Sequence, residues 1–189
     1  MGYPVKEKAL QLLAEAEERN PGPWGDHSRT AAMCAGKIAA ACGMDAEKAW
    51  SLGLLHDIGR RFGITHLAHV WDGYRYLMEL GYPDAARICL THSFCRGDFS
   101  GYVGRYDLPE KEQVMLKTLL EQTTQDDYDR LIQLCDCLAG NGKVVDMEAR
   151  MEDVSRRYGY YPEEKRAVYR RLRRYFEEKC GKDIYEVCR

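Results

Sequence analysis

Residues that typically begin or end helices recur along the whole chain, and they limit the available folds more than any other feature. The segment Asn20-Pro21-Gly22-Pro23 is suited to end a first helix over about residues 3–19. Asp45 is a good N-cap for a helix that reaches about Ile58. The alternation of β-branched and polar residues that marks strands does not occur. The sequence therefore predicts an all-α fold. Further helices are expected over about residues 26–43, 66–80, 83–92, from 107 onward, 124–138 and 162–181.

The domain organisation follows from length and from the lack of linkers. A chain of 189 residues has the size of one ordinary domain, and it contains no repeat or low-complexity tract. The run Thr124-Gln125-Asp126-Asp127 resembles a capping box and is expected to start the helix that ends near Leu138. We therefore expect a single all-helical bundle over residues 1–189, in which helices of residues 147–189 pack on the preceding ones.

Hydropathy and cysteine usage bear on the compartment. Polar residues interrupt every apolar stretch well before the roughly 18 residues that a membrane span needs, so we expect no membrane partner. Residues 1–8 carry acids as well as bases, whereas a signal peptide needs a basic start and an apolar run. The eight cysteines form no Cys-x-x-Cys pair, and several lie in apolar helical runs. These features favour a cytoplasmic protein with reduced thiols.

The overall charge bears on the kind of partner. The net charge of -2 and the isoelectric point near 6.2 give no global attraction to nucleic acid. The basic run at residues 170–174 is more typical of a solvated helix face than of a nucleic-acid interface. A small anionic substrate is compatible with this balance.

The dipeptide His56-Asp57 follows the apolar run Leu52-Gly53-Leu54-Leu55. Buried imidazole and carboxylate groups are costly unless something pairs with them, and both are common metal ligands. Adjacent helical residues do not face the same way, so further ligands must come from other helices. His27 lies on the preceding helix, and Asp136 interrupts a later apolar run. These four residues are the primary candidates for a metal site.

The chain resembles the HD superfamily of metal-dependent phosphohydrolases in the order of His27, His56-Asp57 and Asp136 and in the string LGLLHDIGR. The resemblance covers about residues 24–140. Two further matches are typical of the superfamily's two-metal members, a subgroup that includes bacterial enzymes that split diadenosine tetraphosphate. His69 precedes Gly73 with the spacing His-x-x-x-Gly, and His92 follows the apolar run that begins at Ile88.

The resemblance implies a ligand set and a reaction. His27, His56, Asp57 and Asp136 would bind one divalent metal ion, and Asp57 would bridge to a second ion held by His69 and His92. Mixed nitrogen and oxygen ligands suit iron or manganese, which we expect first, and also zinc, cobalt, nickel or magnesium. The implied reaction is the hydrolysis, by metal-activated water, of a phosphate ester or anhydride in a nucleotide or similar small phosphorylated metabolite.

Substrate contacts are expected from nearby basic residues. Arg60 lies three residues after Asp57 and can offer a guanidinium fork to phosphate, so Asp57 and Arg60 are the expected catalytic residues. Arg96 is a second candidate for substrate binding, and Lys143 a weaker one. The glycine-rich and aromatic loop over residues 94–106 is suited to cover the site.

Several alternatives stay open at this point. His66 lies three residues before His69 and could take its place as ligand, although the spacing to Gly73 favours His69. The same six-ligand site would also suit a di-iron oxygenase, since some helical proteins that resemble this superfamily activate oxygen. A third hypothesis is a regulatory module that binds metal or nucleotide without catalysis.

Overall fold

The computed structural model describes residues 2–189, and over this range it contains helices and no β-strand. The all-α prediction is therefore confirmed. The α-helices are α1 (Lys6–Arg19), α2 (Trp24–Ala41), α3 (Ala46–Leu55), α4 (Ala68–Glu79), α5 (Pro83–Thr91), α6 (Glu110–Gln122), α7 (Asp127–Leu138), α8 (Met147–Tyr158), α9 (Glu163–Cys180) and α10 (Ile184–Cys188), and the 3₁₀ helices are η1 (Ile58–Phe62) and η2 (Phe99–Gly101). None of these helices is both long and apolar enough to cross a membrane.

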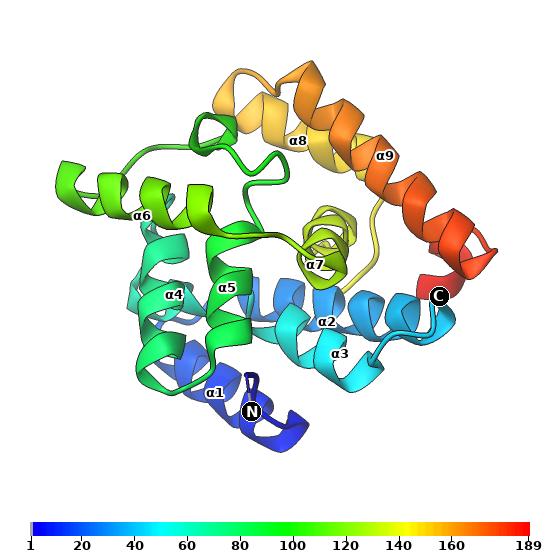
Figure 1. The fold of residues 1–189 in the computed structure, drawn as a ribbon, viewed down its shortest axis with the longest axis horizontal. Coiled ribbons are helices and arrows are strands. Elements are labelled where there is room, and N and C mark those ends of the chain that lie inside the picture. Colours follow the sequence, from blue (N-terminus) through cyan, green and yellow to red (C-terminus); the bar gives the residue numbers. More distant parts are fainter. Residues whose placement is uncertain (1) are drawn as a thin grey trace.

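The α2 and α3 helices pack closely at the centre of the fold (Figure 1). Small residues make this approach feasible, since a Cβ atom added to Gly53 would lie 3.0 Å from the Ala32 Cα atom. The α7 helix packs against both of them, and a large apolar cluster joins α1, α2, α3, α5, α7, α9 and α10. A smaller cluster around Trp71 and Leu116 lies between α4 and α6. The packed centre thus provides a rigid frame for the ends of α2, α3, α5 and α7.

Side-chain caps set the starts of two central helices. The Asp45 carboxylate accepts a hydrogen bond from the Lys48 backbone nitrogen at 2.9 Å, as the sequence predicts. The expected capping box at Thr124–Asp127 is displaced by two residues. The N-cap of α7 is Asp126, and the side chain of Asp129 accepts from the Asp126 nitrogen at 2.8 Å. Aspartate serves here in place of the usual Glu or Gln, which is why the usual sequence pattern does not locate this cap.

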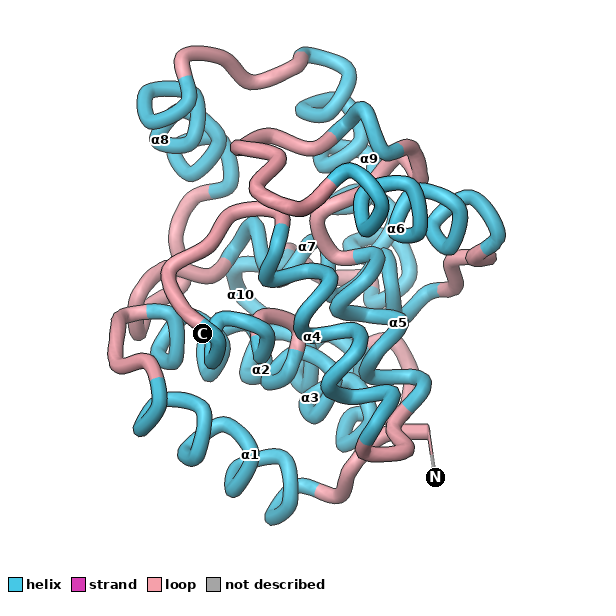
Figure 2. The backbone as a smooth tube through the Cα atoms, turned by 90° about the vertical axis from the view of Figure 1, so that its left-hand side faces the viewer, coloured by secondary structure: helices cyan, strands magenta, loops and turns pink. Residues whose placement is uncertain are grey.

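The α8 and α9 helices lie together at the end of the molecule opposite α1 (Figures 1 and 2). The α9 helix packs on α7, and α8 is tied to α9 by ion pairs such as Arg166 with Glu152 at 2.8 Å. The α8 helix buries only two of its side chains, Met147 and Met151. It is therefore attached to the rest of the protein more lightly than the central helices are.

Gly59, in η1, allows the backbone of η1 to touch α4. A Cβ atom at this position would overlap the His69 carbonyl oxygen and would lie 2.6 Å from the Gly73 nitrogen. Backbone atoms cannot move away as a flexible side chain can, so the absence of a side chain at Gly59 sets the distance between the two elements. This contact brings the segment after α3 next to the first turn of α4.

We expect Gly59→Ala to lower the free energy of unfolding by about 2–3 kcal/mol, because the helix contact must open. Urea unfolding of the two proteins measures the difference. Gly36→Ala is the matched control, because its added Cβ would meet Trp50 at an ordinary 3.4 Å. It should be neutral or stabilising by up to about 1 kcal/mol. Equal stabilities for Gly59→Ala and the unmodified protein would refute the close contact.

Candidate metal centre

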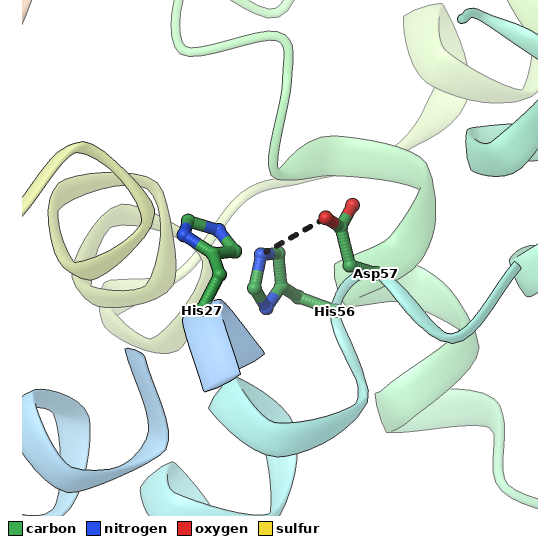
Figure 3. Close-up of side chains that lie close together, drawn as sticks. All are labelled: His27, His56 and Asp57. Atoms are coloured by element: carbon green, nitrogen blue, oxygen red, sulfur yellow. Dashed lines mark ion pairs between the residues drawn. The ribbon is translucent and has the colours of Figure 1, made fainter. Parts of the chain in front are cut away.

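His56 and Asp57 lie where the chain leaves α3. The helix ends at Leu55, three residues earlier than the sequence predicts, and Asp57 takes φ -105° and ψ 13° before η1 begins. This break turns two adjacent side chains toward a common point, which a continuous helix would not do. The His56 Nε2 atom lies 4.0 Å from Asp57 Oδ2, and His27 approaches from the first turn of α2 (Figure 3).

Three further candidates reach the same place from other helices. His69 lies in the first turn of α4, His92 directly follows α5, and Asp136 lies in the last turn of α7. The Nε2 atoms of His69 and His92 lie 3.1 Å and 3.6 Å from Asp57 Oδ1. Asp136 Oδ1 lies 3.0 Å from His27 Nε2 and 3.8 Å from His56 Nε2. The structure therefore brings together all six residues named as ligands from the sequence.

Backbone carbonyls fix the orientation of all four imidazoles. The Nδ1 atoms donate to the carbonyl oxygens of Ala139 (from His27, 3.0 Å), Gly53 (from His56, 2.7 Å), Cys89 (from His92, 2.9 Å) and His66 (from His69). Because a carbonyl can only accept, each neutral ring carries its proton on Nδ1 and leaves the Nε2 lone pair free. Every Nε2 atom points to the centre of the cluster, as in metal-binding histidines.

This arrangement places hydrogen-bond acceptors next to other acceptors, which a bound cation would stabilise. The Nε2 atoms of His69 and His92 lie 3.2 Å apart, and His27 Nε2 faces the Asp136 carboxylate. The buried His56 Nε2 atom has no hydrogen-bond partner within the described part of the chain. The donor atoms form two groups that share Asp57: His27, His56 and Asp57 in one, and Asp57, His69 and His92 in the other. These buried groups fit divalent metal ions, which would satisfy every lone pair at once.

Comparison with known protein families gives an independent assignment. The family model described as "HD domain" matches residues 24–141, more than half of the chain. The chain belongs to the HD domain family. Members of this family are generally metal-dependent hydrolases, and the prediction of this family from the sequence is confirmed. No curated protein and no solved structure matches the chain.

The electrostatics of the HD domain cluster favour ionised carboxylates and neutral imidazoles. Burial alone would raise the pKa of Asp57, but Arg60, His69 and His56 together lower this pKa well below its usual value. Burial, and next the neighbouring His56, lowers the pKa of His92 from 6.5 to about 3. Burial also lowers the pKa of His56. Asp57, His56 and His92 are thus held in the protonation state that binds metal.

These pKa shifts predict how the metal-free protein responds to acid. An unfolded histidine titrates near 6.5, whereas folded His92 titrates near 3, so the unfolded state takes up the proton first. Stability is then full above pH 6.5 and is lost as the pH falls toward 3. His92 alone should lower the free energy of unfolding by about 1 kcal/mol between pH 7 and about 5.5.

Urea unfolding of chelator-treated protein at the two pH values measures this loss. His92→Gln should reduce the pH dependence by about that amount, about 1 kcal/mol. His66→Gln is the control, because His66 lies outside the cluster, and it should keep the original dependence. An unchanged pH dependence in His92→Gln would contradict the assignment.

A cavity of about 490 Å³ opens from the HD domain cluster to the surface. Asp57, His27, His69, His92 and Asp136 lie at its base, together with Arg60. Its walls come from the start of α2, from the loop after α5 and from α8, and they include Trp24, Ser93, Tyr102, Val103, Asn141, Arg150, Asp153, Val154, Arg157 and Tyr158. The size suits a small ligand.

Arg60 lies at the boundary between the metal centre and the cavity. Its Nε atom donates to Asp57 Oδ2 at 2.6 Å, and 29% of its side chain is exposed. One edge of the guanidinium therefore holds the shared carboxylate, while the side chain also lines the cavity. The sequence indicates that Arg60 lies near the substrate, but it does not reveal the hydrogen bond from Arg60 to Asp57.

Two other basic residues named from the sequence lie elsewhere. Arg96 pairs with Asp98 at 2.9 Å and lines a different pocket, between α7 and α9. Lys143 is exposed and does not line the cavity. In the loop after α5, Ser93 lines the cavity of the cluster, whereas Arg96 lines the other pocket. The expectation that Arg96 binds the substrate therefore has no support in this geometry.

The backbone of His66 orients His69, a candidate metal ligand. Its carbonyl oxygen accepts from His69 Nδ1, while its own ring faces Tyr158 of α8, with the tyrosine oxygen 3.4 Å from His66 Nδ1. The choice of His69 over His66 from the sequence thus agrees with the geometry. Tyr158, which the sequence does not single out as a site residue, lines the cavity.

A buried lysine of α9 fastens the loop above the cluster. Lys165 Nζ donates to the carbonyl oxygens of Ser93 and Gly101, both at 3.0 Å. The residue is only 6% exposed, and burial lowers its pKa. Ser93 follows His92, and Gly101 precedes Tyr102, so this one side chain positions the loop wall of the cavity. Nothing in the sequence around Lys165 distinguishes it from the exposed basic residues of the same helix.

Proposed function

We propose that this HD domain protein is a phosphohydrolase that uses two divalent metal ions to cleave a small phosphorylated substrate, such as a nucleotide. The observation that carries the proposal is the shared carboxylate. Asp57 belongs to both groups of metal donors, and the two groups open into one cavity. A pair of cations that shares a carboxylate is the arrangement used to clamp both the attacking and the leaving oxygen of a phosphoryl group.

The six residues divide between the two ions. His27, His56, Asp57 and Asp136 would hold one ion, while Asp57, His69 and His92 would hold the other. When bound, such ions acidify a water molecule and neutralise charge on phosphoryl oxygens. The Nδ1 hydrogen bonds to backbone carbonyls keep the imidazoles aimed at the centre. Iron or manganese is our first expectation for the occupants, because mixed nitrogen and oxygen ligands suit them.

The charge on the cavity wall supports an anionic substrate. The lining includes three aspartates and three arginines, whose charges cancel. Two of the aspartates, Asp57 and Asp136, are the proposed ligands, and each divalent cation adds two positive charges. A cavity loaded with metal is therefore cationic and suits a phosphate group. The unpaired part of the Arg60 guanidinium lines the cavity beside Asp57 and is able to contact that phosphate.

Arg60→Ala should lower kcat/KM for a phosphate ester by about 10- to 100-fold, since a charge-assisted contact is lost. Because Arg60 also holds Asp57, metal affinity should weaken by up to about 10-fold while metal content at saturation stays the same. Arg60→Lys keeps the positive charge but loses the two parallel donors of the guanidinium. Its kcat/KM should lie between those of the unmodified protein and Arg60→Ala. Complete loss of metal in Arg60→Ala would show that Arg60 serves the metal centre alone.

The test of the proposed function is a screen of nucleoside mono-, di- and triphosphates with protein purified without chelator and assayed without oxygen. We expect release of inorganic phosphate or a phosphorylated product, and loss of that release after chelation. An oxygenase would be silent under these conditions, and a regulatory module would bind nucleotide without turnover. Failure of every phosphate ester to react would refute the proposal.

A further inference from the structure

The α8 helix lies outside the segment that matches the HD family, yet one of its faces lines the cavity. The residues on that face are spaced as neighbours on one side of a helix: Arg150, Asp153, Val154, Arg157 and Tyr158. Residues next to this face attach α8 to the rest of the protein. Met147 and Met151 are buried, and Glu148 and Glu152 pair with arginines of α9. The cavity face is therefore free to meet a ligand.

The two arginines on this face are poorly neutralised. Arg150 has no carboxylate within ion-pair distance among residues 2–189. Arg157 lies 3.1 Å from Asp153, but both side chains are about half exposed, so this pair contributes little. Arg156 lies between them in sequence, is exposed and does not line the cavity. Arg150 thus lines the cavity without an ion-pair partner among the described residues, and Arg157 has only a weak, half-exposed one.

We propose that Arg150 and Arg157 bind negative charge on the substrate beyond the phosphoryl group held at the metal centre. The protein would then prefer substrates that carry more than one phosphate. This inference rests on the proposed function, because it takes the metal centre as the place of the scissile phosphate. Guanidinium groups suit this role, since they bind phosphate oxygens through two parallel hydrogen bonds and stay charged at any working pH.

The test compares AMP, ADP and ATP at saturating metal, because these share a base and differ in the number of phosphates. In Arg150→Ala and Arg157→Ala, kcat/KM should change less than about 3-fold for AMP and fall about 10- to 100-fold for ATP, with ADP between them. Arg156→Ala is the matched control and should leave all three values unchanged. Metal content, measured in parallel, should be the same in every variant.

Asp153→Asn separates a binding role of Arg157 from a structural one. It removes the ion pair and leaves the arginine free, so the preference for ATP should persist or increase. If Asp153→Asn lowers kcat/KM for ATP as much as Arg157→Ala does, Arg157 acts through its ion pair with Asp153 and not by binding the substrate. Equal losses for AMP, ADP and ATP in both arginine variants, or no loss, would overturn the inference.

The failure of the proposed function has a different signature. If the unmodified protein cleaves no phosphate ester at all, the proposed function fails, and the dissociation constants of AMP, ADP and ATP from metal-loaded protein replace the kinetics. Isothermal titration calorimetry should then show weaker ATP binding in Arg150→Ala and Arg157→Ala, with AMP binding nearly unchanged. Uniform or absent effects on binding would overturn the inference in this case also.

Discussion

Replacing Asp57 with alanine is expected to remove both metal ions and to lower turnover by about 1,000-fold or more, the largest effect of any single change. Asp57 is the one residue common to both groups of donors, and its two oxygens face different partners. The variant also leaves the Arg60 guanidinium without its carboxylate. The loss of both metal ions should therefore be accompanied by a lower melting temperature.

Metal analysis by mass spectrometry and thermal unfolding check this result together. Asp153→Ala is the matched control, because Asp153 lines the same cavity but lies outside both donor groups. It should keep its full metal content. An Asp57→Ala protein with full metal content and an unchanged melting temperature would refute the assignment of Asp57.

Replacing His69 or His92 with alanine is expected to lower the metal content from about two ions per chain to about one and to reduce turnover by about 100-fold or more. Both residues belong only to the second donor group, whose remaining protein ligand is Asp57. The proposed ligands of the first ion, His27, His56, Asp57 and Asp136, are all kept in these variants. The fold should persist, because the apolar clusters of the core do not depend on either side chain.

Metal stoichiometry and circular dichroism, measured on the same samples, check this prediction. His66→Ala should keep the second ion, because it is the backbone carbonyl of residue 66 that contacts His69, and alanine retains it. His27→Ala should show the reciprocal pattern, with loss of the first ion. One tightly bound ion in the unmodified protein, with both histidine variants fully active, would reduce the centre to one metal.

Local sequence signals account for most of the helices. Asp45 caps α3 as predicted, and the first helix ends at Arg19, just before the segment that starts with Asn20. The sequence predicts the end of α3 too late, at Ile58 instead of Leu55. The break after Leu55 depends on packing against α4 through Gly59, which no local pattern reveals. That break is also what allows His56 and Asp57 to face the same point.

The residue types at the metal centre can be recognised in the sequence because buried histidine and aspartate are costly without a partner. The order of His27, His56-Asp57 and Asp136 therefore indicates one site from the sequence alone. The walls of the cavity cannot be recognised in this way. Arg150 and Arg157 lie on a surface helix whose charged residues resemble any solvated face, and only the tertiary arrangement turns them toward the site. Arg96 is the opposite case: it lies close to His92 in the sequence, but it lines a different pocket.

The most direct test of the central claim is a metal titration of chelator-treated protein, without oxygen, with phosphate release as the readout. The structure brings six candidate ligands together, and two candidate donor groups share Asp57, so activity should be absent without metal and should rise with added Mn²⁺ or Fe²⁺. A plateau at about two ions per chain is the result we predict. Binding of metal with no phosphate release from any substrate, or release that chelation does not affect, would contradict the assignment of this protein as a metal-dependent phosphohydrolase.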